Sequence, residues 1–141
     1  MQKHASAVWQ GALKDGHGII STESGTLQDA PYGFNTRFEG VRGTNPEELI
    51  GAAHAGCFSM ALSAILGQAN LTAERIETRA TVTLEKQAEG FAITAVHLDV
   101  TARVPGATQE SFEQAAQAAK AGCPVSKVLS ARITLDARLA A

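Results

Sequence analysis

The sequence is poor in cysteine and in aromatic residues, and it has no excess of charge of either sign. Two of its 141 residues are cysteines, and 5% are aromatic. Two cysteines are too few for a structural zinc site unless histidines complete it. Twelve basic and fourteen acidic residues leave a net charge of −2, with both signs mixed along the chain. Nucleic acids and anionic membranes bind a concentrated basic face, so we expect neither as the main partner.

From the sequence we also expect no signal peptide and no membrane span. The first residues, "MQKHASAVWQG", contain no long apolar core and already read as a strand. The most apolar stretch, residues 49–66, contains His54, two serines and two glycines, whereas a span needs about 20 apolar residues without that polarity. We therefore expect a buried helix in a cytoplasmic protein, where two cysteines are more often free or redox-active than joined in a structural disulfide.

The residues that are present fit one globular domain. Apolar residues make up 45% of the chain and charged residues 18%, which is the composition of a folded chain. A chain of this length buries about two thirds of its unfolded surface, enough for one core. No internal repeat or linker divides it, so we predict a single domain over residues 1–141.

The N-terminal third predicts short strands and loops. Residues 5–13 and 17–23 are predicted as two strands around an Asp-Gly turn. Residues 23–35 are broken by glycine and proline and are predicted to be mostly loop. The next segment, "TRFEG" at residues 36–40, is predicted as a short strand.

A helix start follows in "GTNPEEL". Asn45 suits the N-cap, Pro46 the first helical position and Glu48 the capping-box position three residues on. The helix is predicted to continue to about Ala69. Glu47 is not needed by the cap, so its carboxylate is available for another role.

The second half of the chain alternates strands and helices. The predicted elements are residues 75–85 (strand), 91–104 (strand), 108–122 (helix closed by Gly122), 123–129 (short helix) and 131–139 (strand). The apolar set changes parity within the second of these strands, which predicts a β-bulge near Thr94–Ala95. This order of elements indicates an α+β fold with a mainly antiparallel sheet.

The long helix predicts a dimer. It is apolar on nearly every face, and such a helix must be covered on all sides. Ala53, Cys57 and Ala61 form a row of small residues at a spacing of four, which lets another helix approach. A second copy of the chain supplies the cover; the alternative is a helix wrapped by its own sheet.

Cys57 has two readings. Buried thiols are mostly inert packing residues, and mid-helix burial raises a thiol pKa. Cys57 is a nucleophile only if a cation lies beside it, and Arg37 and Arg42 are the nearest in sequence. A buried arginine needs a counter-anion, which Glu47 offers. The competing interpretation is a surface ion pair near an unrelated core thiol.

Cys123 and His54 are the other candidates for chemistry. Cys123 precedes Pro124 and is the expected N-cap of the short helix, where free N–H groups and the helix dipole acidify a thiol. His54 shares a helix face with Cys57, three residues away. That spacing permits a Cys–His dyad or half a metal site, but a hydrogen-bonded core histidine is the more common arrangement. We predict no metal and no cofactor.

Several motifs resemble one protein family. "PYGFNTRFEG", "GTNPEELIGAAHAGCFSMAL", "GFAIT", "KAGCPVSKVL" and "ITLD" closely resemble the OsmC subfamily of the OsmC/Ohr proteins, named for osmotic induction and organic hydroperoxide resistance. The resemblance extends from about Trp9 to Leu139. The helix motif and the Cys-Pro motif, with their cysteines 66 residues apart, are specific as a pair.

The resemblance implies an OsmC-like fold, with an antiparallel sheet around a buried central helix in an intertwined homodimer. It also implies a cysteine-based peroxidase that acts in oxidative and osmotic stress. Cys57 matches the peroxidatic cysteine, Cys123 the resolving cysteine, Arg37 the arginine that holds the thiolate and Glu47 the glutamate that orients it. The expected partners are an organic hydroperoxide and an external dithiol.

Two functions of other classes stay open from the residues alone. One is a hydrolase or acyltransferase that uses Cys57 and His54. The other is a non-catalytic, stress-induced ligand-binding protein whose two thiols lie in the core. The peroxidase alone requires both cysteines.

Overall fold

The computed structural model describes residues 1–140, which form two compact units: residues 1–49, and the rest of the chain from residue 50. The long helix α2 (Pro46–Gln68) begins in the first unit and continues in the second. The two units are described separately below.

The N-terminal unit is built on a small antiparallel sheet. Strands β1 (Ala5–Gln10), β2 (His17–Thr22) and β3 (Ala30–Tyr32) pair in that order. The hairpin predicted around the Asp-Gly turn is confirmed, although β1 ends three residues early because Gly11 turns the backbone at φ 93°.

The segment "TRFEG" was predicted as a strand, and that prediction is wrong. Its first residues belong to a short helix, α1 (Phe34–Phe38). The Thr36 hydroxyl accepts a hydrogen bond from the Gly33 N–H at 2.8 Å, and the Phe34 and Phe38 rings stack one turn apart with centroids 4.9 Å apart. These local contacts satisfy the first backbone groups of a helix and outweigh the β propensity of Thr and Phe.

Helix α2 begins where the sequence predicts. The Asn45 side chain accepts a hydrogen bond from the Glu48 N–H at 2.8 Å, which confirms the N-cap. The Glu48 carboxylate lies 3.4 Å from the Thr44 hydroxyl. The helix ends at Gln68, one residue before the predicted end, and Asn70 then takes a left-handed conformation with φ 58°.

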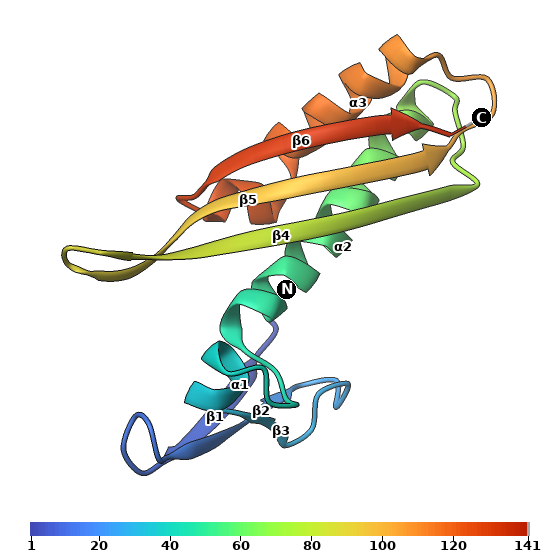
Figure 1. The fold of residues 1–141 in the computed structure, drawn as a ribbon. Helices are drawn as coiled ribbons and strands as arrows, with labels where there is room; N and C mark the ends of the chain where they lie inside the picture. The colour runs from blue at the N-terminus through green and yellow to red at the C-terminus, as the bar shows by residue number, and fades with distance from the viewer. Residues whose placement is uncertain (141) are drawn as a thin grey trace. The chain divides into compact units, whose positions relative to one another are not determined.

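The second unit contains a three-stranded sheet, seen in Figure 1 with α2 and α3 on the same side of it. Strands β4 (Arg75–Gln87) and β5 (Gly90–Arg103) form an antiparallel hairpin. Thr83 pairs with Ala95 and Leu84 with Ile93, so Thr94 is the extra residue of a bulge. The predicted bulge is confirmed.

The last strand corrects the predicted topology. Strand β6 (Arg132–Leu139) pairs with β5 in parallel, so the mainly antiparallel sheet predicted for the whole chain is in fact two three-stranded sheets, one of them mixed. Helices α3 (Gln109–Gly122) and α4 (Pro124–Val128) connect β5 to β6. A crossover of this length, made of helices, returns the chain in the same direction.

Burial of one stripe of α2 fixes how the helix is rotated. His54, Phe58, Leu62 and Leu66 are at most 1% exposed and recur every four residues. They pack with the inner face of β5 and with Phe112 and Ala116 of α3. Cys57 lies at the margin of this stripe and is half-buried, packed against the same core.

The other side of α2 is not covered by the described residues of the second unit. The exposed residues of the helix are Glu48, Ala52, Ala53, Gly56, Met60, Ser63, Ala64, Gly67 and Gln68. By length and composition alone α2 is apolar enough to cross a membrane, with a mean hydropathy of 1.7 over its most apolar window. The core helix of a soluble protein has the same composition, and α2 packs its buried stripe on a sheet.

Candidate active site

Two free thiols meet in the second unit. Cys57 lies in the middle of α2, and Cys123 lies between α3 and α4. The Cys57 thiol donates a hydrogen bond to the Cys123 sulfur. The fold thus brings together two sulfurs that are 66 residues apart in sequence.

Cys123 occupies the joint between two helices. It is at once the C-cap of α3 and the N-cap of α4, with Pro124 in the first turn. The prediction that Cys123 is the N-cap of the short helix is confirmed. Gly122 was predicted to be the C-cap of α3, but it is the last residue of that helix, and Cys123 is the C-cap. Burial raises the pKa of Cys123, but hydrogen bonds from Cys57, from the N–H groups of Ser126 and Val125 and from the Ser126 hydroxyl together lower it below its ordinary value.

The surroundings of Cys57 shift its pKa in the opposite direction. Cys57 lies in the middle of α2, and the side chains around it within the unit are mostly apolar. Burial raises the pKa of Cys57, and the hydrogen bond that it donates to Cys123 raises it further, more than the N–H of Val125 lowers it. Within this unit a negative charge shared by the two sulfurs therefore resides on Cys123. This agrees with the expectation that Cys57 needs an added cation to ionise.

Arg37 and Glu47 form an ion pair in the N-terminal unit. Arg37 is on α1, and Glu47 is in the first turn of α2. The Arg37 Nε lies 3.1 Å from each carboxylate oxygen of Glu47, and a terminal nitrogen of the guanidinium contacts Glu47 Oε1 as well. The Glu47 side chain is 13% exposed and that of Arg37 34%. The carboxylate thus fixes one edge of the guanidinium, and the arginine's other terminal nitrogen remains for an anion.

An aromatic pocket of about 310 Å³ adjoins Arg37. Its lining consists of Trp9, Leu13, Tyr32, Gly33, Phe34, Arg37, Phe38 and Pro46. The rings of Trp9 and Tyr32 lie 5.6 Å apart, and the Arg37 guanidinium lies over the Phe38 ring at 5.4 Å. Sequence reasoning missed this pocket, although four of the chain's seven aromatic residues line it.

His54 pairs with a residue that the sequence did not single out. Its Nε2 lies 2.8 Å from the Ser126 Oγ of α4. Its Nδ1 is buried and has no hydrogen-bond partner among residues 1–140. Burial lowers the pKa of His54, which keeps the imidazole neutral at pH 7. His54 is thus a core histidine bonded to Ser126 through its Nε2.

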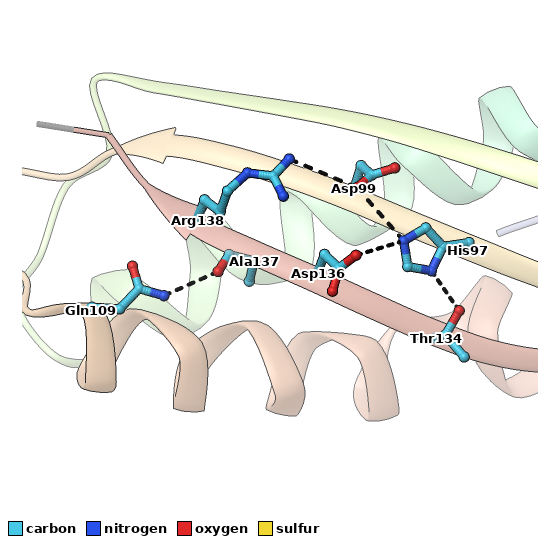
Figure 2. A network of polar contacts seen from close by, with 7 residues as sticks. All are labelled: His97, Asp99, Gln109, Thr134, Asp136, Ala137 and Arg138. Atoms are coloured by element: carbon cyan, nitrogen blue, oxygen red, sulfur yellow. Dashed lines mark hydrogen bonds and ion pairs between the residues drawn. The ribbon is translucent and has the colours of Figure 1, made fainter.

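One group of side chains in the described part of the chain has the composition of a metal site. Ligand atoms of His97, Asp99 and Asp136 lie within 4.8 Å of one another on the outer face of the β5–β6 pair (Figure 2). Both imidazole nitrogens are engaged, at 2.6 Å from Thr134 Oγ1 and 3.1 Å from Asp136 Oδ2. Arg138 also lies 3.8 Å from Asp99. We interpret the group as a polar network that joins two parallel strands.

Comparison with known proteins identifies relatives along the whole chain. Residues 38–138 match the family of OsmC-like proteins. The chain is 58% identical over 139 residues to "Peroxiredoxin OsmC" of Escherichia coli strain K12, which covers 99% of this chain and 97% of that protein.

Solved structures share the fold. The organic hydroperoxide resistance protein OhrB of Bacillus subtilis superposes with a TM-score of 0.68 at 26% identity, over 97% of this chain and 98% of that one. An OsmC-like protein from Mycoplasma pneumoniae reaches a TM-score of 0.77 over 100% and 99% of the two chains, at 12% identity, which supports the fold alone.

Proposed function

The chain belongs to the family of OsmC-like proteins, and we propose that it reduces organic hydroperoxides through a Cys57 sulfenic acid and a Cys57–Cys123 disulfide. Its activity class, a cysteine-based peroxidase, follows from near full-length similarity to a peroxiredoxin. The contact between the Cys57 and Cys123 sulfurs supports the assignment of the two thiols to one reaction.

We assign Arg37 the task of ionising Cys57. A guanidinium about 4 Å from a thiolate is worth roughly 4 kcal/mol at an effective dielectric constant of about 20. That energy corresponds to about three pKa units, enough to reverse the effect of burial on Cys57. Glu47 holds the guanidinium by its Nε edge and supplies the counter-charge of this partly exposed cation.

The chemistry then has two steps. The Cys57 thiolate attacks one peroxide oxygen, the O–O bond breaks, and the alkoxide leaves and takes a proton to become the alcohol. Cys57 is left as a sulfenic acid. The Cys123 sulfur then attacks the Cys57 sulfur, the S–O bond breaks, and water leaves as the disulfide forms. An external dithiol reduces the disulfide by thiol exchange.

The aromatic pocket supports a preference for organic substrates. Its volume of about 310 Å³ and its ring lining suit an alkyl or aryl tail, and it adjoins the arginine proposed to hold the reacting sulfur. Hydrogen peroxide has no tail to bury there. We propose alkyl or lipid hydroperoxides as substrates, in oxidative and osmotic stress.

A homodimer accounts for the uncovered apolar surface. Met60 on the open side of α2 is 76% exposed, and Val8 of β1 is 53% exposed. A second copy that covers α2 removes Met60 from water, and Val8 belongs to further apolar surface that a partner can cover. Light scattering on the purified protein should give twice the chain mass, and a monomer at working concentration would reject the dimer.

We further propose that both units act as one domain in the cytoplasm, because the family match spans the two units. The nearly equal numbers of basic and acidic residues support the proposal that neither a nucleic acid nor a membrane is a partner.

Mass spectrometry of the intact protein tests the proposal. The reduced protein is mixed with one equivalent of cumene hydroperoxide and quenched with an alkylating reagent. A loss of two hydrogens with no alkylation supports the disulfide. A Cys57–His54 hydrolase predicts instead thioester turnover that needs no Cys123. A non-catalytic protein predicts an unchanged mass, and either of these two results rejects the peroxidase.

A further inference from the structure

We propose that Ser126, held in place by His54, is a positioning residue that directs the Cys123 sulfur toward Cys57 and keeps it reactive in the second step. This inference rests on the proposed function, since it assigns Cys123 to that step. It concerns two residues to which that function gives no role.

The three side chains form one buried hydrogen-bonded chain. His54 is on α2, whereas Ser126 and Cys123 belong to the first turn of α4 and its N-cap. His54 and Cys123 are completely buried, and Ser126 is 9% exposed. The His54 Nε2 lies 2.8 Å from the Ser126 Oγ. Ser126 follows the N-cap Cys123 by three residues in the first turn of α4, and its hydroxyl acts as a donor that lowers the pKa of the Cys123 thiol.

Hydrogen-bond accounting fixes the direction of this chain. A serine hydroxyl has one hydrogen, and here it is donated to Cys123. The Ser126 oxygen therefore accepts from His54, which places the imidazole proton on Nε2. The His54 Nδ1 is then a bare acceptor, and it has no hydrogen-bond partner among residues 1–140. An unpaired buried polar atom costs stability, so a histidine needed only for packing is a poor choice at this site.

No other charge competes for Cys123 among the elements that pack around it. The side chains that β4, β5 and β6 turn inward are uncharged. Lys127 of α4 is exposed, and Lys120 of α3 lies at its partly exposed end. The titratable groups that face Cys123 are therefore Cys57 and His54. Burial keeps the pKa of His54 low and its side chain neutral.

The donors around Cys123 are the backbone N–H groups of Ser126 and Val125, the Cys57 thiol and the Ser126 hydroxyl. Cys57 loses its thiol hydrogen when it ionises before the first step, so the Ser126 hydroxyl is the donor of these two side chains that persists into the second step. The Cys123 thiolate attacks the sulfur of the Cys57 sulfenic acid, the S–O bond breaks, and hydroxide leaves and takes a proton from solvent. Ser126 holds the attacking sulfur in place without giving up its own proton.

A peroxide-free titration tests the hydroxyl directly. In a Cys57→Ser background, the pKa of Cys123 is read from the pH dependence of its alkylation. We expect Ser126→Ala to raise this pKa by about one unit, a tenfold loss of thiolate at a given pH, and Ser126→Thr to restore it. Ser59→Ala is the matched control, because Ser59 of α2 is a partly buried serine whose hydroxyl bonds to Thr78 of β4 and not to Cys123. A pKa that is unchanged by Ser126→Ala overturns the proposal.

The role of His54 has its own measurements. His54→Leu is expected to raise the Cys123 pKa by part of the serine effect, and His54→Gln, which keeps an N–H near the Nε2 position, to restore it. The ¹⁵N spectrum of the unmutated protein should show the Nε2–H tautomer of His54. An Nδ1–H tautomer overturns the inference even if every variant fails to fold.

Single-turnover kinetics connect the titration to the reaction. With one equivalent of cumene hydroperoxide, Ser126→Ala should slow disulfide formation more than sulfenic acid formation. Equal slowing of both steps indicates a structural role and overturns the inference. If the unmutated protein consumes no hydroperoxide, the proposed function fails, while the titration still reports on the hydrogen-bonded chain.

Discussion

The N-terminal unit holds its functional charge in a partly exposed ion pair between a five-residue helix and the start of α2, whereas the second unit holds its two thiols against a packed core. The Arg37 side chain is 34% exposed, and Cys123 is completely buried. One region therefore supplies a charge and an apolar pocket near the surface, and the other supplies sulfur in fixed positions.

Under the proposed function the two regions have different tasks: the second unit supplies the two thiols and the first unit supplies the cation. In the second unit the negative charge resides on Cys123, which is proposed to react second, because burial and the bond to Cys123 raise the pKa of Cys57. The first unit contains a guanidinium whose charge has the sign needed to reverse that order, but it contains no cysteine. Substitutions in the first unit and in the second unit should therefore have different effects on the reaction.

The largest effect is expected at the sulfur proposed to react first. Cys57→Ser should abolish hydroperoxide consumption, because a serine hydroxyl is not ionised at neutral pH and does not attack peroxide. Consumption of cumene hydroperoxide in the presence of excess dithiol is the measurement. Retained turnover in this variant would transfer the first step to Cys123.

Cys123→Ser should stop the reaction after one turnover. The first step still converts Cys57 to a sulfenic acid, but no resolving thiol is present to form the disulfide. A burst of one equivalent of alcohol per chain is expected, followed by stalling or over-oxidation visible as added oxygen in the mass spectrum. Continued turnover at the original rate would show that the external thiol attacks Cys57 directly.

Arg37→Ala should raise the Cys57 pKa by about three units, and so lower the thiolate population at pH 7 by roughly a thousandfold. The alkylation rate of Cys57 against pH, in a Cys123→Ser background, is the measurement. Since a raised pKa means that the thiolate appears only at higher pH, the profile should move toward alkaline pH.

Two related variants sharpen that result. Glu47→Gln, which removes the counter-charge but keeps an acceptor, should shift the profile in the same direction by less. Arg42→Ala changes the exposed arginine of the same unit, and an equal shift there would mean that overall charge, not Arg37, sets the pKa.

The smallest effect is expected in the aromatic pocket. Phe34→Ala removes part of its lining, and loss of a few buried methylene equivalents is worth about 1–3 kcal/mol of discrimination between substrates. The rate with cumene hydroperoxide should fall several-fold to a hundredfold, while the rate with hydrogen peroxide should stay the same. Equal losses with both substrates would remove the pocket from substrate recognition.

The sequence predicted the elements whose signals are local. The Asn45-Pro46 helix start, the alternation in β4 and the bulge at Thr94 depend on neighbouring residues, and all three are confirmed. The strand predicted at "TRFEG" failed because a capping contact of Thr36 with Gly33 decides the local structure. The direction of β6 failed because it depends on how α3 and α4 cross the sheet, which strand composition does not encode.

The candidate site likewise contains one contact that the sequence predicted and one that it did not. The pairing of Arg37 with Glu47 was anticipated from charge and position, and the structure confirms that contact. The catalytic roles of Cys57, Cys123, Arg37 and Glu47 stay predictions. Ser126 was missed because its partner His54 lies 72 residues earlier in the chain, and only the tertiary fold brings the two side chains together.

Cys123 ends one helix and begins the next, at the middle of the crossover that leads to β6. A covalent link from this joint to α2 closes a loop of 66 residues, and such closure lowers the entropy of the unfolded chain by an amount worth about 4 kcal/mol. In the proposed cycle, each round of peroxide reduction links the crossover covalently to the central helix, and each reduction by dithiol releases it. The oxidation state of the two cysteines therefore also changes the stability of the folded chain in this cycle.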